Sequence, residues 1–236
     1  MNPTIARLSS QALLGRRRGV VLVLIPAVLL LLAVIVGLLT DDVAVGYDAV
    51  TSLGFTLALP LVALLAATAV LGPEVDDGSI VYLLSKPVSR HVVAVSKFVI
   101  AWAATMVLGA LPVLVAGLVL DVGDLRQALA WGVGAAVAGT AYTALFLALA
   151  AFTRHAVVVG LLFALLWEGV LGNLLDGIRW LAIGPWGREV AAAVSDRVPS
   201  PEVGLTYAVV AAVLVTAGSV WFTGDRLRSF TLRGDE

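Results

Sequence analysis

The sequence contains no cysteine and little charge. Charged residues make up 13% of its 236 residues, and it has two histidines. Without cysteine the chain forms no disulfide, no zinc–thiolate site and no thiol nucleophile. Soluble globular domains are about 45–50% apolar and about 25% charged, whereas this chain is 61% hydrophobic, with a mean hydropathy of +1.04. These values exclude an ordinary soluble enzyme, a disordered protein and a secreted disulfide scaffold. They indicate a protein that crosses a membrane several times.

Other absences narrow the function further. The formal net charge of −1 argues against a nucleic-acid partner. The chain has no Gly-Lys dipeptide and therefore no G-x-x-x-x-G-K loop to hold nucleotide phosphates. The two histidines are isolated in the sequence, and neither suggests a metal site. We therefore expect no catalytic, cofactor-binding or metal-binding residues in this chain. If ATP drives the protein, we expect ATP and Mg²⁺ to be bound by a separate chain.

Apolar runs predict six transmembrane helices. Their lengths of 18 to 24 residues are close to the roughly 20 residues that cross about 30 Å of hydrocarbon. The runs are Val20–Leu39, Val50–Leu71, Phe98–Leu120, Ala128–Ala151, Ala156–Leu175 and Leu205–Phe222. The predicted fold class is an all-α membrane protein with one transmembrane domain over residues 1–236.

The positive charges predict the orientation. With the N-terminus in the cytoplasm, 11 of the 15 lysines and arginines fall in cytoplasmic segments and only Arg126, Arg179, Arg188 and Arg197 fall outside. This distribution follows the positive-inside rule. An even number of spans then places both termini in the cytoplasm. Residues 1–19 predict an amphipathic helix lying on the membrane surface, because apolar residues recur there at helical spacing among arginines. Residues 176–204 form an extracellular segment in this topology.

The cytoplasmic loop over residues 72–97 carries the most information. Acidic residues precede a short helical segment, Ser79–Ser85, and Pro87 ends it, because the residue before a proline is pushed out of the helical region. Ser89 is then the expected N-cap of the next helix. A helix of one or two turns is unstable alone, and this one exposes Tyr82, Leu83 and Leu84. We expect it to bind a partner groove, although a loop lying on the lipid headgroups is the alternative.

These loop residues resemble the signature of ABC-2 type transporter permeases, the membrane subunits of ATP-binding-cassette transporters. In that family the loop between spans two and three reads approximately E-x3-G-T-x3-L-L-S/T-x-P-V/I-S/T-R, and a lysine follows at the start of span three. The matching residues here are Glu74, Gly78, Ser79, Leu83, Leu84, Pro87, Ser89, Arg90 and Lys97. Six spans, cytoplasmic termini and an N-terminal amphipathic helix extend the resemblance along the chain.

The resemblance implies a permease subunit that moves a substrate across the cytoplasmic membrane, preferably outward. ATP would be hydrolysed by two copies of a separate ABC ATPase, each contacting a coupling helix in the 72–97 loop. A second permease chain would complete the transporter, as a homodimer or less favourably a heterodimer, surrounded by membrane lipid. Two alternatives belong to other classes: an intramembrane enzyme such as a protease, and a scaffold or immunity factor that transports nothing.

Glu168 is the only formal charge inside the predicted spans. A carboxylate at mid-bilayer costs roughly 2.5–3.5 kcal/mol on insertion scales, so it normally faces a bundle interior or a wet cavity. One hypothesis gives Glu168 a role in substrate or proton handling. The other makes it a structural group bonded to another span or to a backbone turn. In the segment that follows, Trp186, Val190 and Val194 recur at helical spacing and predict a short amphipathic helix at the membrane interface.

The orientation predicts a labelling pattern. Because the chain lacks cysteine, single cysteines can be introduced without background. Cysteines at Asp41 or Asp124 should react with an impermeant maleimide in intact cells, and cysteines at Arg154 or Arg228 should react only after permeabilisation. The reverse pattern would contradict the orientation and the cytoplasmic placement of the 72–97 loop.

Overall fold

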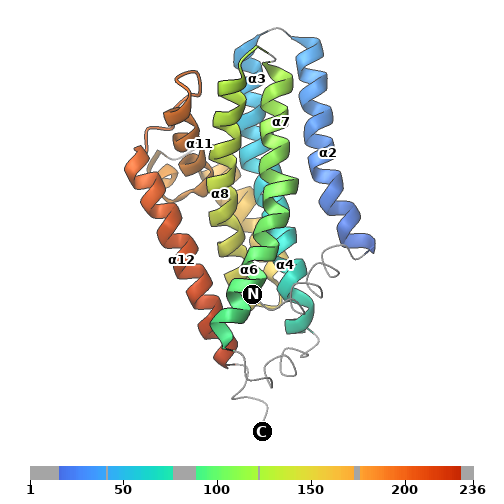
Figure 1. Ribbon diagram of the computed structural model, residues 1–236, viewed down its shortest axis with the longest axis vertical. Coiled ribbons are helices and arrows are strands. Elements are labelled where there is room, and N and C mark those ends of the chain that lie inside the picture. The colour runs from blue at the N-terminus through green and yellow to red at the C-terminus, as the bar shows by residue number, and fades with distance from the viewer. Residues whose placement is uncertain (1–15, 41, 77–88, 122, 173–175, 230–236) are drawn as a thin grey trace.

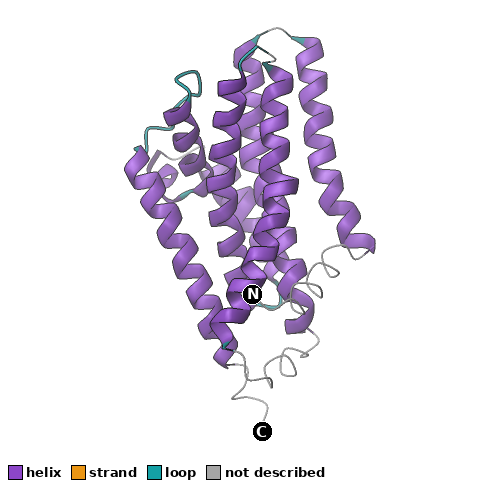
Figure 2. Cartoon of the chain, viewed as in Figure 1, coloured by secondary structure: helices purple, strands orange, loops and turns teal. Residues whose placement is uncertain are grey.

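The computed structural model describes residues 16–40, 42–76, 89–121, 123–172 and 176–229, and these ranges contain helices and no strands (Figures 1 and 2). The α-helices are α2 (Arg16–Leu39), α3 (Val43–Ala49), α4 (Leu59–Asp76), α6 (Arg90–Thr105), α7 (Leu111–Leu120), α8 (Leu125–Phe152), α9 (Ala156–Leu162), α11 (Ile183–Val194) and α12 (Leu205–Ser229). Of three π-helical segments, η1 (Val50–Ala58) joins α3 to α4, η2 (Met106–Ala110) joins α6 to α7, and η3 (Phe163–Leu171) continues α9. The segment η4 (Asp176–Leu181) is a 3₁₀-helix.

Five helical stretches in the described ranges are long and apolar enough to cross a membrane. They are Gly19–Leu39, Ala44–Leu71, Arg90–Leu120, Leu125–Phe152 and Leu205–Leu227. The expected span over 156–175 is described as the shorter apolar helix Ala156–Leu171. At 1.5 Å per residue it covers about 24 Å, less than the roughly 30 Å of a hydrocarbon core. The predicted all-helical, multi-pass fold is confirmed, whereas the sixth crossing and the cytoplasmic termini remain predictions.

Helix α8 is the centre of the bundle. It packs against α4, α6, α7, α9, α11 and α12, and 18 of its 28 residues are buried. Figure 1 shows α8 and α7 in the middle, with α2 and α12 at opposite sides. Only 22% of the most apolar window of α2 and 11% of that of α12 are buried, so these two helices form the periphery. We call the end with the α7–α8 turn, at the top of Figure 1, the upper end. The lower end holds the start of α6 and the end of α12.

Two prolines explain two of the π-helical segments. Pro60 and Pro112 are each the second residue of an α-helix that directly follows a π-helical segment, η1 and η2 respectively. A proline has no N–H to donate and its ring clashes with the carbonyl four residues earlier. Widening the preceding turn relieves this conflict and lets the helix continue. The two prolines are therefore accommodated by π turns inside continuous helices.

Small residues on α8 let its neighbours approach closely. A Cβ added to Gly134 would overlap the carbonyl oxygen of Gly187 on α11, and a Cβ on Gly187 would lie 2.6 Å from the Gly134 carbonyl oxygen. The two helices thus touch backbone to backbone. On another face, the Thr143 hydroxyl lies 2.9 Å from that of Thr105 and 2.7 Å from the Gly139 carbonyl, which links α8 to α6.

The Gly134–Gly187 contact predicts that glycine-to-alanine substitutions at two sites will differ in their effect on stability. Gly134→Ala places a methyl group against α11 and should cost about 1–3 kcal/mol, as overpacking usually does, lowering Tm by several degrees. Gly218→Ala on α12 has nothing within 4 Å of the new Cβ and should leave Tm unchanged or slightly higher. Thermal unfolding in detergent checks both variants. Equal Tm values would show that the α8–α11 contact does not limit stability.

Candidate functional site: a buried carboxylate at the start of α11

The Glu168 carboxylate caps a helix that belongs to another part of the chain. Glu168 lies in η3 with 5% of its surface exposed. Its Oε1 accepts a hydrogen bond from the Ile183 N–H at 2.7 Å, and its Oε2 accepts one from the Gly184 N–H at 3.1 Å. These N–H groups open α11, where the first turn has no intrahelical acceptors. Ala182, the N-cap residue, makes no side-chain cap. Glu168 therefore supplies the missing acceptors and places its charge at the positive helix end.

Glycine fits closely where this carboxylate meets α11. A Cβ at position 184 would lie 3.2 Å from Glu168 Oε2 and 3.3 Å from the Tyr142 hydroxyl. A larger residue would need the carboxylate or the phenol to move by a few tenths of an ångström. Pro185 follows in the first turn of α11, a position where its missing N–H costs nothing. The Ile-Gly-Pro sequence thus starts the helix and leaves room for Glu168.

Tyr142 and Arg188 complete a polar cluster inside an otherwise apolar bundle. Tyr142, on α8, is fully buried, and its hydroxyl has no hydrogen-bond partner among the described residues. The hydroxyl lies beside the Glu168 carboxylate. Arg188 is one turn along α11 from Gly184. Burial lowers the pKa of the Arg188 guanidinium, and its attraction to Tyr142 and Glu168 acts in the opposite direction. The cluster therefore joins a carboxylate, a phenol and a guanidinium from η3, α8 and α11.

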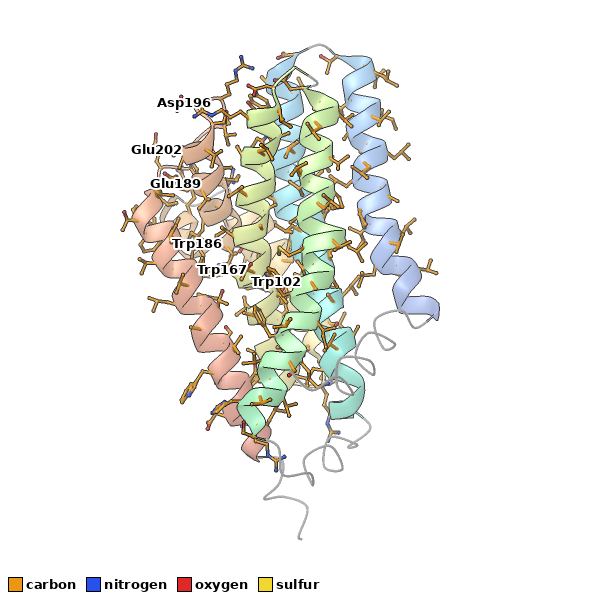
Figure 3. The ribbon with its side chains drawn as sticks, in the orientation of Figure 1. Trp102, Trp167, Trp186, Glu189, Asp196 and Glu202 are labelled. Carbon is orange, nitrogen blue, oxygen red and sulfur yellow. The ribbon has the colours of Figure 1, made fainter. Side chains whose placement is uncertain are left out.

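Hydrogen bonds around the cluster hold the 176–204 segment against the bundle. The Trp167 indole N–H donates to the Leu181 carbonyl at 3.4 Å, and the Trp186 indole donates to the Trp180 carbonyl at 3.0 Å. The Tyr207 hydroxyl of α12 donates to the same Trp180 carbonyl at 2.8 Å. Figure 3 labels Trp186, which belongs to this segment, and Trp167 near it. The predicted helix through Trp186 and Val190 is confirmed, but both residues are buried, so it packs into the bundle instead of lying on its surface.

The upper end has an ionic connection that the sequence did not predict. Arg197, after α11, lies 3.1 Å from a carboxylate oxygen of Asp124 and 3.5 Å from one of Asp121. The Arg126 Nε–H donates to the Val194 carbonyl at 2.8 Å. Both contacts tie the end of α11 to the α7–α8 turn. Because the pairing residues are about 70 positions apart, no local sequence pattern identifies them. The sequence analysis also missed Tyr142. The feature that could have pointed to it is a tyrosine within an alanine-rich predicted span.

The structure describes only part of the predicted coupling loop. Gly78, Ser79, Tyr82, Leu83, Leu84 and Pro87 lie outside the described residues. Ser89 caps α6 as predicted, accepting a hydrogen bond from the Val92 N–H at 3.4 Å, and Arg90 begins that helix. The backbone of Glu74 lies in the last turns of α4. The structure therefore brings Glu74, Ser89 and Arg90 to the ends of the two helices that flank the loop.

Lys97 connects these two helices. It is fully buried, and its Nζ donates to the Val70 carbonyl of α4 at 2.8 Å, among other interactions. A buried ammonium without partners would cost several kcal/mol, so this contact restricts how α4 and α6 separate. The Lys97–Val70 hydrogen bond therefore joins the two helices that flank residues 77–88.

The family follows from comparison with known proteins. Residues 5–185 match the family described as ABC-2 family transporter protein, which covers more than half of the chain. The chain belongs to this family and is a multi-pass membrane permease of an ABC transporter. Comparison with curated proteins found no match. The match includes the predicted loop, η3 with Glu168 and the first residues of α11, and it ends before α12.

The two hydrogen bonds that Glu168 accepts from the start of α11 predict the behaviour of Glu168 variants. Glu168→Gln keeps one acceptor but turns an NH₂ group toward one of the two N–H donors, so transport should fall partially and Tm should drop. Glu168→Leu removes both acceptors and should cost more, since hydrogen bonds to a charged group contribute about 1.5–3 kcal/mol each. Glu202→Gln, at an exposed side chain, is the matched control. A Glu168→Gln protein with wild-type Tm and no transport would favour a role in substrate or proton handling.

Proposed function

We propose that the chain is the membrane half of an ABC exporter in the cytoplasmic membrane. Its 236 residues act as one permease domain, with the lower end and the 72–97 loop in the cytoplasm. A second permease chain, in the preferred case an identical copy, completes the pathway. Two copies of a separate ATPase bind the loops and hold ATP and Mg²⁺. The family assignment supports a transporter, and the concentration of arginine and lysine toward the lower end supports this orientation.

The buried Lys97–Val70 contact carries the proposal for the loop. Residues 77–88 are joined in the chain to the ends of α4 and α6, so a push on them acts directly on these two helix ends. Because Lys97 joins α4 and α6, such a push moves both helices as a pair. Both helices also pack on α8, which contacts α11 and α12. Movement at the loop therefore reaches the centre of the bundle without passing through the peripheral helix α2.

The arrangement of polar groups argues against the intramembrane-protease alternative. Glu168 lies beside Tyr142 and near Arg188, inside the bundle. The chain has two histidines, and both lie at the lower end: His91 in the first turn of α6 and His155 just before α9. Glu168 has no histidine within reach as an acid–base partner. Its described bonds hold α11 in place, which favours the structural hypothesis for this residue.

The loop proposal predicts a selective loss of ATPase binding. Leu83→Ala together with Leu84→Ala removes two side chains that are each worth about 1.5–3 kcal/mol when buried. Retention of the ATPase should fall more than tenfold, since about 1.4 kcal/mol is one decade. The measurements are pull-down of the ATPase that co-purifies with the wild type, and ATP turnover in nanodiscs.

A matched control separates this effect from general damage. Leu38→Ala together with Leu39→Ala makes the same change at the far end of α2, where the side chains are 81% and 80% exposed. This control should insert, pair and retain the ATPase like the wild type. If the Leu83/Leu84 variant binds and stimulates the ATPase normally, the loop is not the coupling element.

A further inference from the structure

Arg188 of α11 has no acceptor for its donors, unlike the other two arginines of the 176–204 segment. It is half-buried, and within the described part of the chain it forms no hydrogen bond or ion pair. Arg197 lies 3.1 Å from a carboxylate oxygen of Asp124, and Arg179 also has a partner. A guanidinium carries five N–H donors and keeps its charge, so partial burial without acceptors is unfavourable. Arg188 therefore needs acceptors that the described residues do not supply.

Tyr142 of α8 brings a second donor without a partner to the same region. Its hydroxyl is fully buried and has no hydrogen-bond partner among the described residues. The hydroxyl lies against position 184 of α11, and Arg188 follows Gly184 by four residues, on the same face of that helix. The two side chains interact electrostatically. Helices α8 and α11 thus place a phenol and a guanidinium together, each with unused donors.

Glu168 does not satisfy these donors. Its two oxygens accept from the first two N–H groups of α11, at 2.7 and 3.1 Å. Among the described acidic side chains it alone acts electrostatically on Arg188, and it forms no ion pair with Arg188. Burial and, more weakly, the positive charge of Arg179 lower the pKa of Arg188. The negative charge of Glu168 weakens binding of an anion here, but it leaves the guanidinium and the phenol without acceptors.

The unused groups define the chemistry of a ligand. Both are hydrogen-bond donors and one is a cation, so a matching ligand brings acceptor oxygens and negative charge. Arginine binds carboxylate and phosphate groups through paired hydrogen bonds that fit its planar fork. A neutral apolar ligand would leave the donors of Arg188 and Tyr142 unsatisfied.

We propose that Arg188 and Tyr142 bind an oxyanion, the phosphate or carboxylate group of a ligand, where α8 meets α11. The group belongs either to a soluble anion or to a lipid headgroup. In the proposed orientation the 176–204 segment lies outside the cell, so the ligand arrives from that side. The site itself depends neither on that orientation nor on an ATPase partner.

Thermal unfolding of the full chain tests this site. In detergent, inorganic phosphate is compared with chloride at equal ionic strength, and in phosphatidylcholine nanodiscs, discs with and without phosphatidylglycerol are compared. One of the two anions should raise Tm by about 3 °C at ten times its Kd. Arg188→Gln should weaken this binding more than about tenfold, and Tyr142→Phe, which loses one donor, about fivefold. An effect of phosphate assigns the site to a soluble anion, and an effect of phosphatidylglycerol alone assigns it to a headgroup.

Arg197→Gln is the matched control, because this arginine of the same segment is already paired with Asp121 and Asp124. It should keep the full response to the anion. Without the anion, Arg188→Gln should unfold at the wild-type Tm or above it, since it removes a charge that has no partner. A Tm several degrees lower without the anion would make Arg188 a structural counter-charge to Glu168 and overturn the proposal. No response of the wild type to either anion, or an equal response in Arg188→Gln, would also overturn it and leave Arg188 to water.

Discussion

The position of α11 in the bundle depends on two hydrogen bonds, from the N–H groups of Ile183 and Gly184 to the carboxylate of Glu168. The first turn of a helix has N–H groups without acceptors, and hydrocarbon supplies none. An isolated carboxylate at this depth is also unfavourable. The Glu168 carboxylate therefore supplies acceptors to the two N–H groups, and the two N–H groups stabilise the buried carboxylate. With this pair formed, α11 can begin inside the bundle and bury Trp186 and Val190.

Packing around that pair is concentrated on α8. Gly134 and Gly187 bring α11 to backbone contact, and the Thr105–Thr143 hydroxyl pair holds α6 on another face. Helices α2 and α12 contribute far less buried surface. Helix α8 packs against six other helices, so a shift of α8 disturbs more of the bundle than a shift of α2 or α12. Local stability should follow the same order.

The sequence predicted features that depend on local patterns. The apolar runs, the Ser89 cap and the helix through Trp186 and Val190 follow from hydropathy, a capping residue and a helical period, and the structure contains them. The partners of Glu168, Lys97 and Arg197 were not predicted, because the chain must fold before distant groups meet. The π-helical segments were also missed, since an i→i+5 hydrogen bond leaves hydropathy unchanged. The described apolar helix Ala156–Leu171 is shorter than the predicted run over 156–175, whose residues 173–175 lie outside the described part of the chain.

The π-helical segments also affect how this chain is compared with its relatives. A π turn accommodates an extra residue within a continuous helix. A relative that forms an ordinary α-helix in place of η1 or η2 has one residue fewer there. An ungapped alignment through residues 50–58 would then place every later residue about 100° out of register around the helix. Lipid-facing and buried positions would be exchanged without any change in hydropathy. Pro60 and Pro112 are therefore safer alignment markers than the ends of the spans.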